Sequence, residues 1–120
     1  NYLHRQGIRA LYVVGSTGEG VSLSTSERKA AAGAFVQAAR DRLPVLVQVG
    51  HTSLAEARDL AAHAQEMGAE GVSAVAPFYF KPASADLLAD CMAEIAAGAP
   101  RLPFYYYHIR AVTGGSCDLV

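Results

Sequence analysis

The sequence has few of the features that disulfide-linked, membrane-spanning or secreted proteins need. Its 120 residues include only two cysteines, Cys91 and Cys117, which are too few for a disulfide framework. No apolar run approaches the length of a membrane span, and the first ten residues lack the apolar core of a signal peptide. Together these absences favour a soluble protein of the reducing cytoplasm.

An excess of charge of either sign is also missing. The chain has 10 Lys and Arg against 11 Asp and Glu, with no basic patch of the kind that nucleic acid binding needs. The four histidines show no HxH or HxxxH spacing, so no metal site is expected. Apolar residues make up 52% of the chain, which predicts a folded protein.

The most informative stretch is LYVVGSTGEG, residues 11–20. Its four leading apolar residues predict a strand covered on both faces. Glycines allow a close backbone approach, and the hydroxyls of Ser16 and Thr17 can donate hydrogen bonds to an anion or carbonyl. The turn matches neither a dinucleotide fingerprint nor a P-loop nor a nucleophile elbow, so what remains is a short turn rich in hydrogen-bond donors. We expect no cofactor. On composition alone, a plain tight turn before a helix is an equal alternative.

Strands and helices are predicted in strict alternation. Ser24 with Glu27, and Ser53 with Glu56, have the spacing of capping boxes, and Ser84 is the expected N-cap of a third helix. The strands are expected at residues 11–14, 45–49, 71–76 and 102–107. This order predicts an α/β protein with a parallel sheet. A doubly wound sheet and a (β/α)8 barrel both fit it.

Two details of the helices are also predicted. The first helix should end near Arg42, because Pro44 cannot continue it. The inner side of the third helix should hold four apolar or small residues, namely Leu87, Leu88, Cys91 and Ile95.

Each predicted strand ends in polar or aromatic residues, which in a parallel sheet meet at one edge. Tyr105 and Tyr107 share a face of the last strand, and a phenol can donate or accept a proton. Packing alone explains an aromatic residue in a strand, and that is the expected role of Tyr106. Neither lysine, Lys29 or Lys81, falls at a strand end, where an imine-forming lysine would project.

Three segments resemble the N-acetylneuraminate lyase and dihydrodipicolinate synthase family of class I, Schiff-base aldolases. They are GSTGEG, APFYFKP and LPFYYYHI followed by AVTGG, and their order and spacing are strongly specific. The resemblance covers nearly the whole chain. It implies a partial (β/α)8 TIM barrel, roughly strands 2 to 5, with residues 1–120 as one partial domain truncated at both ends.

The resemblance also implies roles for individual residues. Ser16 and Thr17 match the pair that binds the pyruvate carboxylate, and Tyr107 matches the tyrosine that contacts the Schiff base and moves protons. Tyr79 matches a tyrosine that, in the synthase branch, crosses a dimer interface into the neighbouring site. The imine-forming lysine is expected on the sixth strand, beyond residue 120, and the complete protein is expected to be a homotetramer.

The branch of the family follows from the turn after Tyr107. The synthase branch has an arginine five residues after this tyrosine, where the chain has Val112. The resemblance therefore implies reversible cleavage of N-acetylneuraminate to N-acetylmannosamine and pyruvate, although Arg110 stands where the family has proline. Two alternatives stay open: another pyruvate-dependent 2-keto acid aldolase or dehydratase, and a catalytically inactive truncated product.

Overall fold

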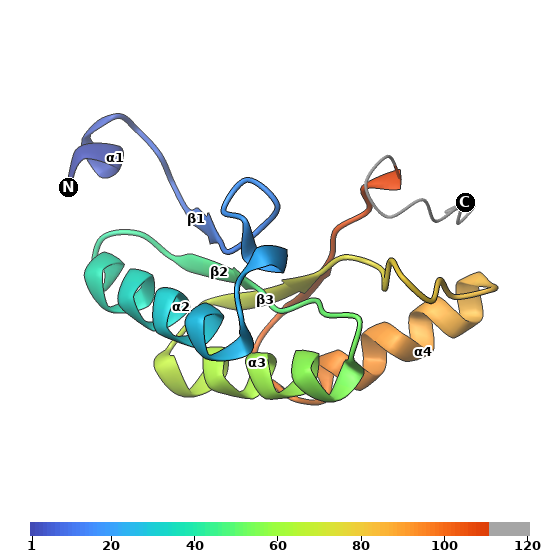
Figure 1. The fold of residues 1–120 in the computed structure, drawn as a ribbon. Helices are drawn as coiled ribbons and strands as arrows, with labels where there is room; N and C mark the ends of the chain where they lie inside the picture. Colours follow the sequence, from blue (N-terminus) through green and yellow to red (C-terminus); the bar gives the residue numbers. More distant parts are fainter. Residues whose placement is uncertain (111–120) are drawn as a thin grey trace.

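Four parallel strands form one sheet, and each strand lies beside the next one in the sequence (Figure 1). The computed structural model of the chain describes residues 1–110. The strands are β1 (Leu11–Val13), β2 (Val45–Gln48), β3 (Gly71–Ala74) and β4 (Phe104–Tyr106). Their order is β1-β2-β3-β4, and every neighbouring pair is parallel. The predicted alternation is therefore confirmed, although each strand is shorter than expected.

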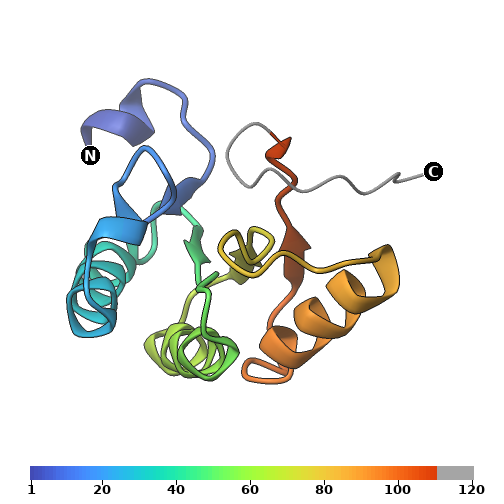
Figure 2. The ribbon, with the colours of Figure 1, turned by 45° about the vertical axis from the view of Figure 1, so that its right-hand side comes forward.

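The three long helices all lie on the same face of this sheet (Figure 2). They are α2 (Thr25–Ala39), α3 (Leu54–Met67) and α4 (Ala85–Ala96), preceded by the short α1 (Tyr2–Arg5) and a 3₁₀ turn, η1 (Gly20–Ser22). A doubly wound sheet would carry helices on both faces and reverse its strand order. Sequential strands with helices on one face are instead the arrangement of a (β/α)8 barrel segment, so the barrel alternative is correct.

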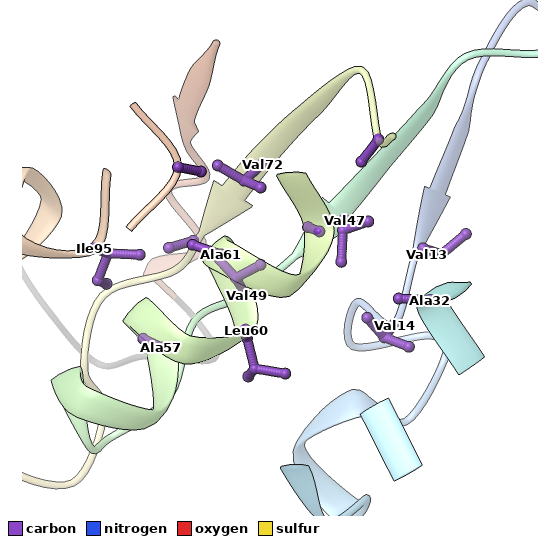
Figure 3. Close-up of a cluster of buried hydrophobic side chains, with 14 of the residues drawn as sticks. Val13, Val14, Ala32, Val47, Val49, Ala57, Leu60, Ala61, Val72 and Ile95 are labelled. Atoms are coloured by element: carbon purple, nitrogen blue, oxygen red, sulfur yellow. The ribbon is translucent and has the colours of Figure 1, made fainter. Parts of the chain in front are cut away.

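The core lies between the sheet and these helices (Figure 3). Successive residues of a strand point to opposite faces, so Val47 and Val49 of β2 and its C-terminal extension face the helices together. They meet alanines of α3, Ala57 and Ala61, which are fully buried. Small side chains let the helix approach the sheet closely. This packing leaves the other face of the sheet free of helices within residues 1–110.

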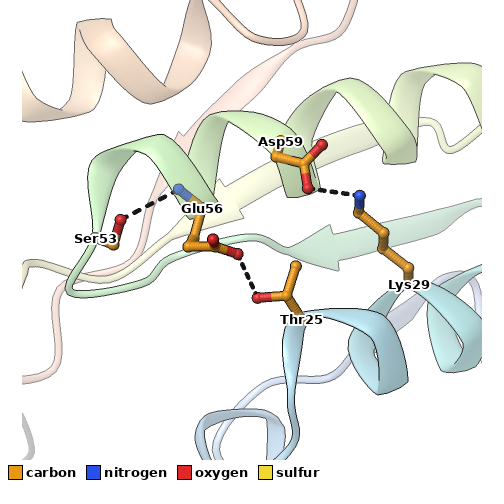
Figure 4. A network of polar contacts seen from close by, with 5 residues as sticks. All are labelled: Thr25, Lys29, Ser53, Glu56 and Asp59. Carbon is orange, nitrogen blue, oxygen red and sulfur yellow. Dashed lines mark hydrogen bonds and ion pairs between the residues drawn. The ribbon is translucent and has the colours of Figure 1, made fainter.

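Helices α2 and α3 begin as predicted, but only α2 has a complete capping box. Ser24 Oγ accepts a hydrogen bond from the Glu27 backbone N–H, and the Glu27 carboxylate accepts one from the Ser24 backbone N–H. Ser53 Oγ likewise accepts from the Glu56 N–H. The Glu56 carboxylate, however, accepts from Thr25 Oγ1 at 2.6 Å and so joins α3 to α2 (Figure 4). The predicted second capping box is therefore wrong in this half.

Two helix predictions need correction. Helix α2 ends at Ala39 rather than near Arg42, because the ψ of Arg40, 135°, is not helical and Asp41 has a φ of +69°. Leu87 is half-exposed and does not lie on the inner side of α4, where Met92 is buried in addition to Leu88 and Ile95. Helical spacing alone did not show that Leu87 and Leu88, which are adjacent, differ in burial.

Strand β1 is not covered on both faces in the part of the chain that the structure describes. Tyr12 points away from the helices and is 41% exposed, whereas Val13 and Val14 are buried. The strand ends at Val13 because Val14 has a φ of +52°, a strained conformation for a β-branched residue. The chain turns sharply there into the glycine-rich segment.

Replacing Ile95 by alanine should remove a fully buried side chain from the core. Ile95 has 0% relative exposure, so we expect Ile95→Ala to lower the free energy of unfolding by about 2–5 kcal/mol in urea denaturation. Ile8→Ala is the matched control, because Ile8 is exposed and its truncation should cost less than about 0.5 kcal/mol. Equal losses in the two variants would contradict the core described above.

The Glu27 capping box should make stability depend on pH in a defined direction. Hydrogen bonds from the backbone and side chain of Ser24 lower the pKa of Glu27. A lowered pKa gives a stabilisation that is present above the unfolded-state pKa and lost as pH falls through the folded-state pKa. Glu27→Gln keeps an acceptor without the titration. We therefore expect urea midpoints measured from about pH 6 to pH 3 to fall more steeply for the unaltered protein than for this variant.

Candidate functional site

A tight turn over residues 15–20 follows β1 at the edge where the strands end. It is closed by backbone hydrogen bonds from Gly20 N–H to the Gly15 carbonyl oxygen (3.1 Å) and from Glu19 N–H to the Ser16 carbonyl oxygen (3.0 Å). Gly20 is required for steric reasons, because a Cβ there would lie 1.9 Å from the carbonyl oxygen of Val14. Backbone hydrogen bonds within the turn thus hold its shape, and the side chains of Ser16 and Thr17 are exposed.

Ser16 and Thr17 are both exposed on this turn. Within residues 1–110, neither hydroxyl takes part in a hydrogen bond. Two adjacent hydroxyls without an internal partner can both donate to one small anion, such as a carboxylate. This is the arrangement expected of a carboxylate-binding turn, and the role itself stays a prediction.

Tyr107 lies one residue beyond β4 at the same edge of the sheet. Its backbone N–H donates to the Ala74 carbonyl oxygen at 2.9 Å, which extends the pairing of β3 with β4. Tyr105 and Tyr107 are both half-exposed, whereas Phe104 and Tyr106 pack against the core. The predicted alternation along this strand is therefore confirmed, and it leaves the Tyr107 phenol on the face without helices.

Tyr12 connects the turn with Tyr107, and the sequence alone did not identify it. Its ring meets the Tyr107 ring edge to face, with the centroids 5.9 Å apart and an interplanar angle of 88°. It also lies against Gly15, where an added Cβ would be 2.8 Å from Tyr12 Cε1. The sequence did contain a signal that could have identified Tyr12, because an aromatic residue stands inside an apolar run that leads into a glycine-rich turn.

The Tyr12 hydroxyl donates a hydrogen bond to Ser73 Oγ at 3.3 Å. Burial raises the pKa of Tyr12, and the nearby Tyr107 phenol raises it further. The hydrogen bond with Ser73 and the positive charge of Arg28 oppose this increase. Because the net shift is upward, the Tyr12 phenol stays neutral and remains a donor at physiological pH.

Arg28 of α2 is a second residue that sequence reasoning missed. Its guanidinium is only 2% exposed and donates to the carbonyl oxygens of Gly50 and Gln48, each at 2.8 Å, and to Gln48 Oε1 at 3.0 Å. Burial lowers the pKa of Arg28, and the Tyr12 phenol opposes the shift. The guanidinium thus holds the chain where it leaves β2, close to the candidate site.

The other predicted residues lie outside this cluster. Tyr79 is 76% exposed in the loop after β3 and stacks edge to face on Phe80. Its role at an interface stays a prediction, as does the homotetramer. Val112, on which the choice of branch depended, lies outside the described residues.

Neither lysine is positioned to form an imine in this cluster. Lys29 pairs with Asp59 on the helix-covered side of the sheet, as Figure 4 shows. Lys81 lies in the loop between β3 and α4. His51 accepts a hydrogen bond from the Ser53 backbone N–H, and His108 bonds to the Tyr106 hydroxyl. Residues 1–110 contain neither a group of His, Cys, Asp and Glu side chains suited to a metal nor a helix able to cross a membrane.

A model of the dihydrodipicolinate synthetase family matches residues 1–119. The chain belongs to this family of class I aldolases. It is 50% identical over 110 residues to the human N-acetylneuraminate lyase, an alignment that covers 91% of this chain and 34% of the relative. The chain therefore spans about a third of the length of the curated relatives it matches.

Solved structures place the fold in the same family. The N-acetylneuraminate lyase of Aliivibrio salmonicida superimposes with a TM-score of 0.94 at 37% identity, covering 98% of this chain and 39% of that structure. The Escherichia coli protein YagE, solved in complex with pyruvate, gives 0.89 at 35% identity, with 98% and 38% covered. The four strands and their helices thus match part of a TIM-barrel aldolase, as the sequence motifs predicted.

Removing the Arg28 guanidinium should destabilise the protein strongly. Arg28→Met keeps the aliphatic stem but leaves three buried acceptors without their donor, so we expect a loss of about 2–4 kcal/mol in urea denaturation. Lys29→Met is the matched control at the next position. Its ion pair is solvent-exposed, so its loss should cost less than about 1 kcal/mol. A near-neutral Arg28→Met would show that the guanidinium does not hold the end of β2.

Proposed function

We propose that this chain forms the pyruvate-binding part of an N-acetylneuraminate lyase. The complete enzyme would cleave N-acetylneuraminate reversibly to N-acetylmannosamine and pyruvate through a lysine Schiff base, with the lysine supplied by chain beyond Val120. One observation carries the proposal. The Ser16–Thr17 turn and the Tyr107 phenol are joined through Tyr12 at one edge of the sheet. The 50% identity to the human lyase supports the choice of substrate.

Each residue has a task in this reaction. The Ser16 and Thr17 hydroxyls donate hydrogen bonds to the carboxylate of the keto acid and fix the position of its ketone carbon. The lysine amine attacks that carbon and forms an imine, with loss of water. Tyr107 then takes the proton of the C4 hydroxyl as the C3–C4 bond breaks, and the bonding electrons move toward the protonated imine. N-acetylmannosamine leaves with its new aldehyde, and the lysine is left holding an enamine. The proton that Tyr107 accepted passes to C3 of this enamine and restores the imine, which water hydrolyses to pyruvate and the free lysine.

Substituting Tyr107 should reduce catalysis more than substrate binding. In the full-length protein encoded by the gene, we expect Tyr107→Phe to lower kcat for pyruvate release from N-acetylneuraminate by about 10²- to 10³-fold, because the phenylalanine cannot move a proton. Pyruvate release is followed with a coupled dehydrogenase. Tyr105→Phe is the control, since Tyr105 shares the face of Tyr107 but leans onto Gly71 at the start of β3.

The same assay separates the competing substrates. Release of pyruvate from another 2-keto sugar acid, and none from N-acetylneuraminate, would overturn the substrate while keeping the aldolase class. A full-length protein that releases pyruvate from neither would overturn the proposed function. An unchanged kcat in Tyr107→Phe would remove Tyr107 from the mechanism.

A further inference from the structure

Tyr12 occupies a position that the proposed roles of Ser16, Thr17 and Tyr107 leave unexplained. It projects from the middle of β1 onto the face of the sheet without helices. A tyrosine there, with part of its ring exposed, adds little to the helix-covered core. Its contacts instead run to the two parts of the candidate site.

The first contact is with the backbone of the turn. A Cβ built on Gly15 would lie 2.8 Å from Cε1 and 3.2 Å from Cδ1 of Tyr12, so the ring rests directly on the glycine. Gly15 immediately precedes Ser16, and its φ is not in the left-handed region. A glycine is therefore needed here to make room for the ring rather than to permit an unusual backbone conformation.

The second contact is with Tyr107. The two rings meet at 88° with centroids 5.9 Å apart, which is a favoured geometry for aromatic pairs. The side chain of Tyr107 is half-exposed, and its backbone is held by β3. The Tyr12 ring therefore restricts where the Tyr107 phenol can lie.

The third contact anchors Tyr12 itself. Its hydroxyl donates to Ser73 Oγ, on β3, so the side chain spans the width of β2. Ser73 is buried, with 3% exposure, and gives the ring a fixed end. The raised pKa of Tyr12 is consistent with a permanent donor in this bond.

We propose that Tyr12 is a positioning residue that sets the distance between the carboxylate-binding turn and the Tyr107 phenol. This inference rests on the proposed function, because it assumes the roles given to Ser16, Thr17 and Tyr107. The ring acts as a spacer between Gly15 and Tyr107, and the bond to Ser73 holds its orientation. The ring matters more than the hydroxyl, since the ring makes both contacts with the site.

Two substitutions separate the ring from the hydroxyl. In the full-length protein, Tyr12→Leu removes the ring, and we expect kcat to fall by about 10- to 100-fold, in keeping with the cost of a small misplacement of a catalytic group. Tyr12→Phe keeps the ring and should stay within about threefold of the unaltered enzyme, because it loses only a neutral hydrogen bond. Tyr105→Leu is the matched control for loss of a tyrosine from this face, and it should leave kcat unchanged.

A double-mutant cycle tests whether Tyr12 acts through Tyr107. If it does, adding Tyr12→Leu to Tyr107→Phe should lower kcat by less than about threefold further, because the phenol it positions is already gone. Two effects that multiply in full would overturn the proposal. A kcat unchanged by Tyr107→Phe alone would also overturn it, because Tyr12 would then have no catalytic phenol to position. Failure of the proposed function gives a different result, namely no release of pyruvate by the unaltered full-length protein, so the two failures are distinguishable.

Gly15→Ala provides a second route to the same test if Tyr12→Leu does not fold. The added methyl would push the ring away from the turn while leaving Tyr12 intact. We expect about a tenfold loss of kcat with Tyr107 present, and almost no further loss in Tyr107→Phe. Full activity of Gly15→Ala, in protein whose melting temperature is unchanged, would contradict the role of the ring as a spacer.

Discussion

The structure depends on the packing of small side chains from the helices against one face of a parallel sheet. The buried alanines of α3 let it lie close to the valines of β2 and β3, and the same face receives α2 and α4. Because all three helices occupy this face, the strands curve as a barrel segment does, and their carboxyl ends meet at one edge. The candidate site exists only because this packing holds residues from β1, β3 and β4 together.

The opposite face carries the residues to which we assign the chemistry. Alternation along each strand places Tyr12, Ser73 and Tyr107 on the side without helices, while their neighbours pack into the core. Tyr12 then joins residues that are far apart in the sequence, since its hydroxyl reaches Ser73, 61 positions later. Arg28 plays a comparable part at the end of β2, where its guanidinium donates to the carbonyl oxygens of Gln48 and Gly50. These long-range contacts join the elements that meet at this edge of the sheet.

Sequence patterns predicted the features that depend on neighbouring residues, such as the start of a helix. Serine caps set the starts of α2, α3 and α4, and the glycine and proline residues set the approximate ends of the elements. Strict alternation of strands and helices could not separate a barrel from a doubly wound sheet, because the spacing of apolar residues does not show on which side of the sheet a helix packs.

Contacts between distant residues were not predicted. The Glu56 carboxylate was assigned to its own helix but bonds to Thr25, 31 positions away. Sequence reasoning missed Tyr12 and Arg28 for the same reason, because the residues they bond to are distant in the sequence. The glycine-rich turn was found because the role proposed for it depends on residues that are adjacent in the sequence.

We propose that the chain carries a pyruvate site whose imine-forming lysine lies elsewhere in the complete enzyme. Borohydride reduction of the full-length protein with pyruvate, followed by peptide mapping of the reduced adduct, tests it most directly. Lys29 is paired with Asp59 on the helix-covered side, and Lys81 lies in a loop. We expect a single stable adduct on a lysine outside residues 1–120. An adduct on Lys29 or Lys81, or no adduct at all, would contradict it.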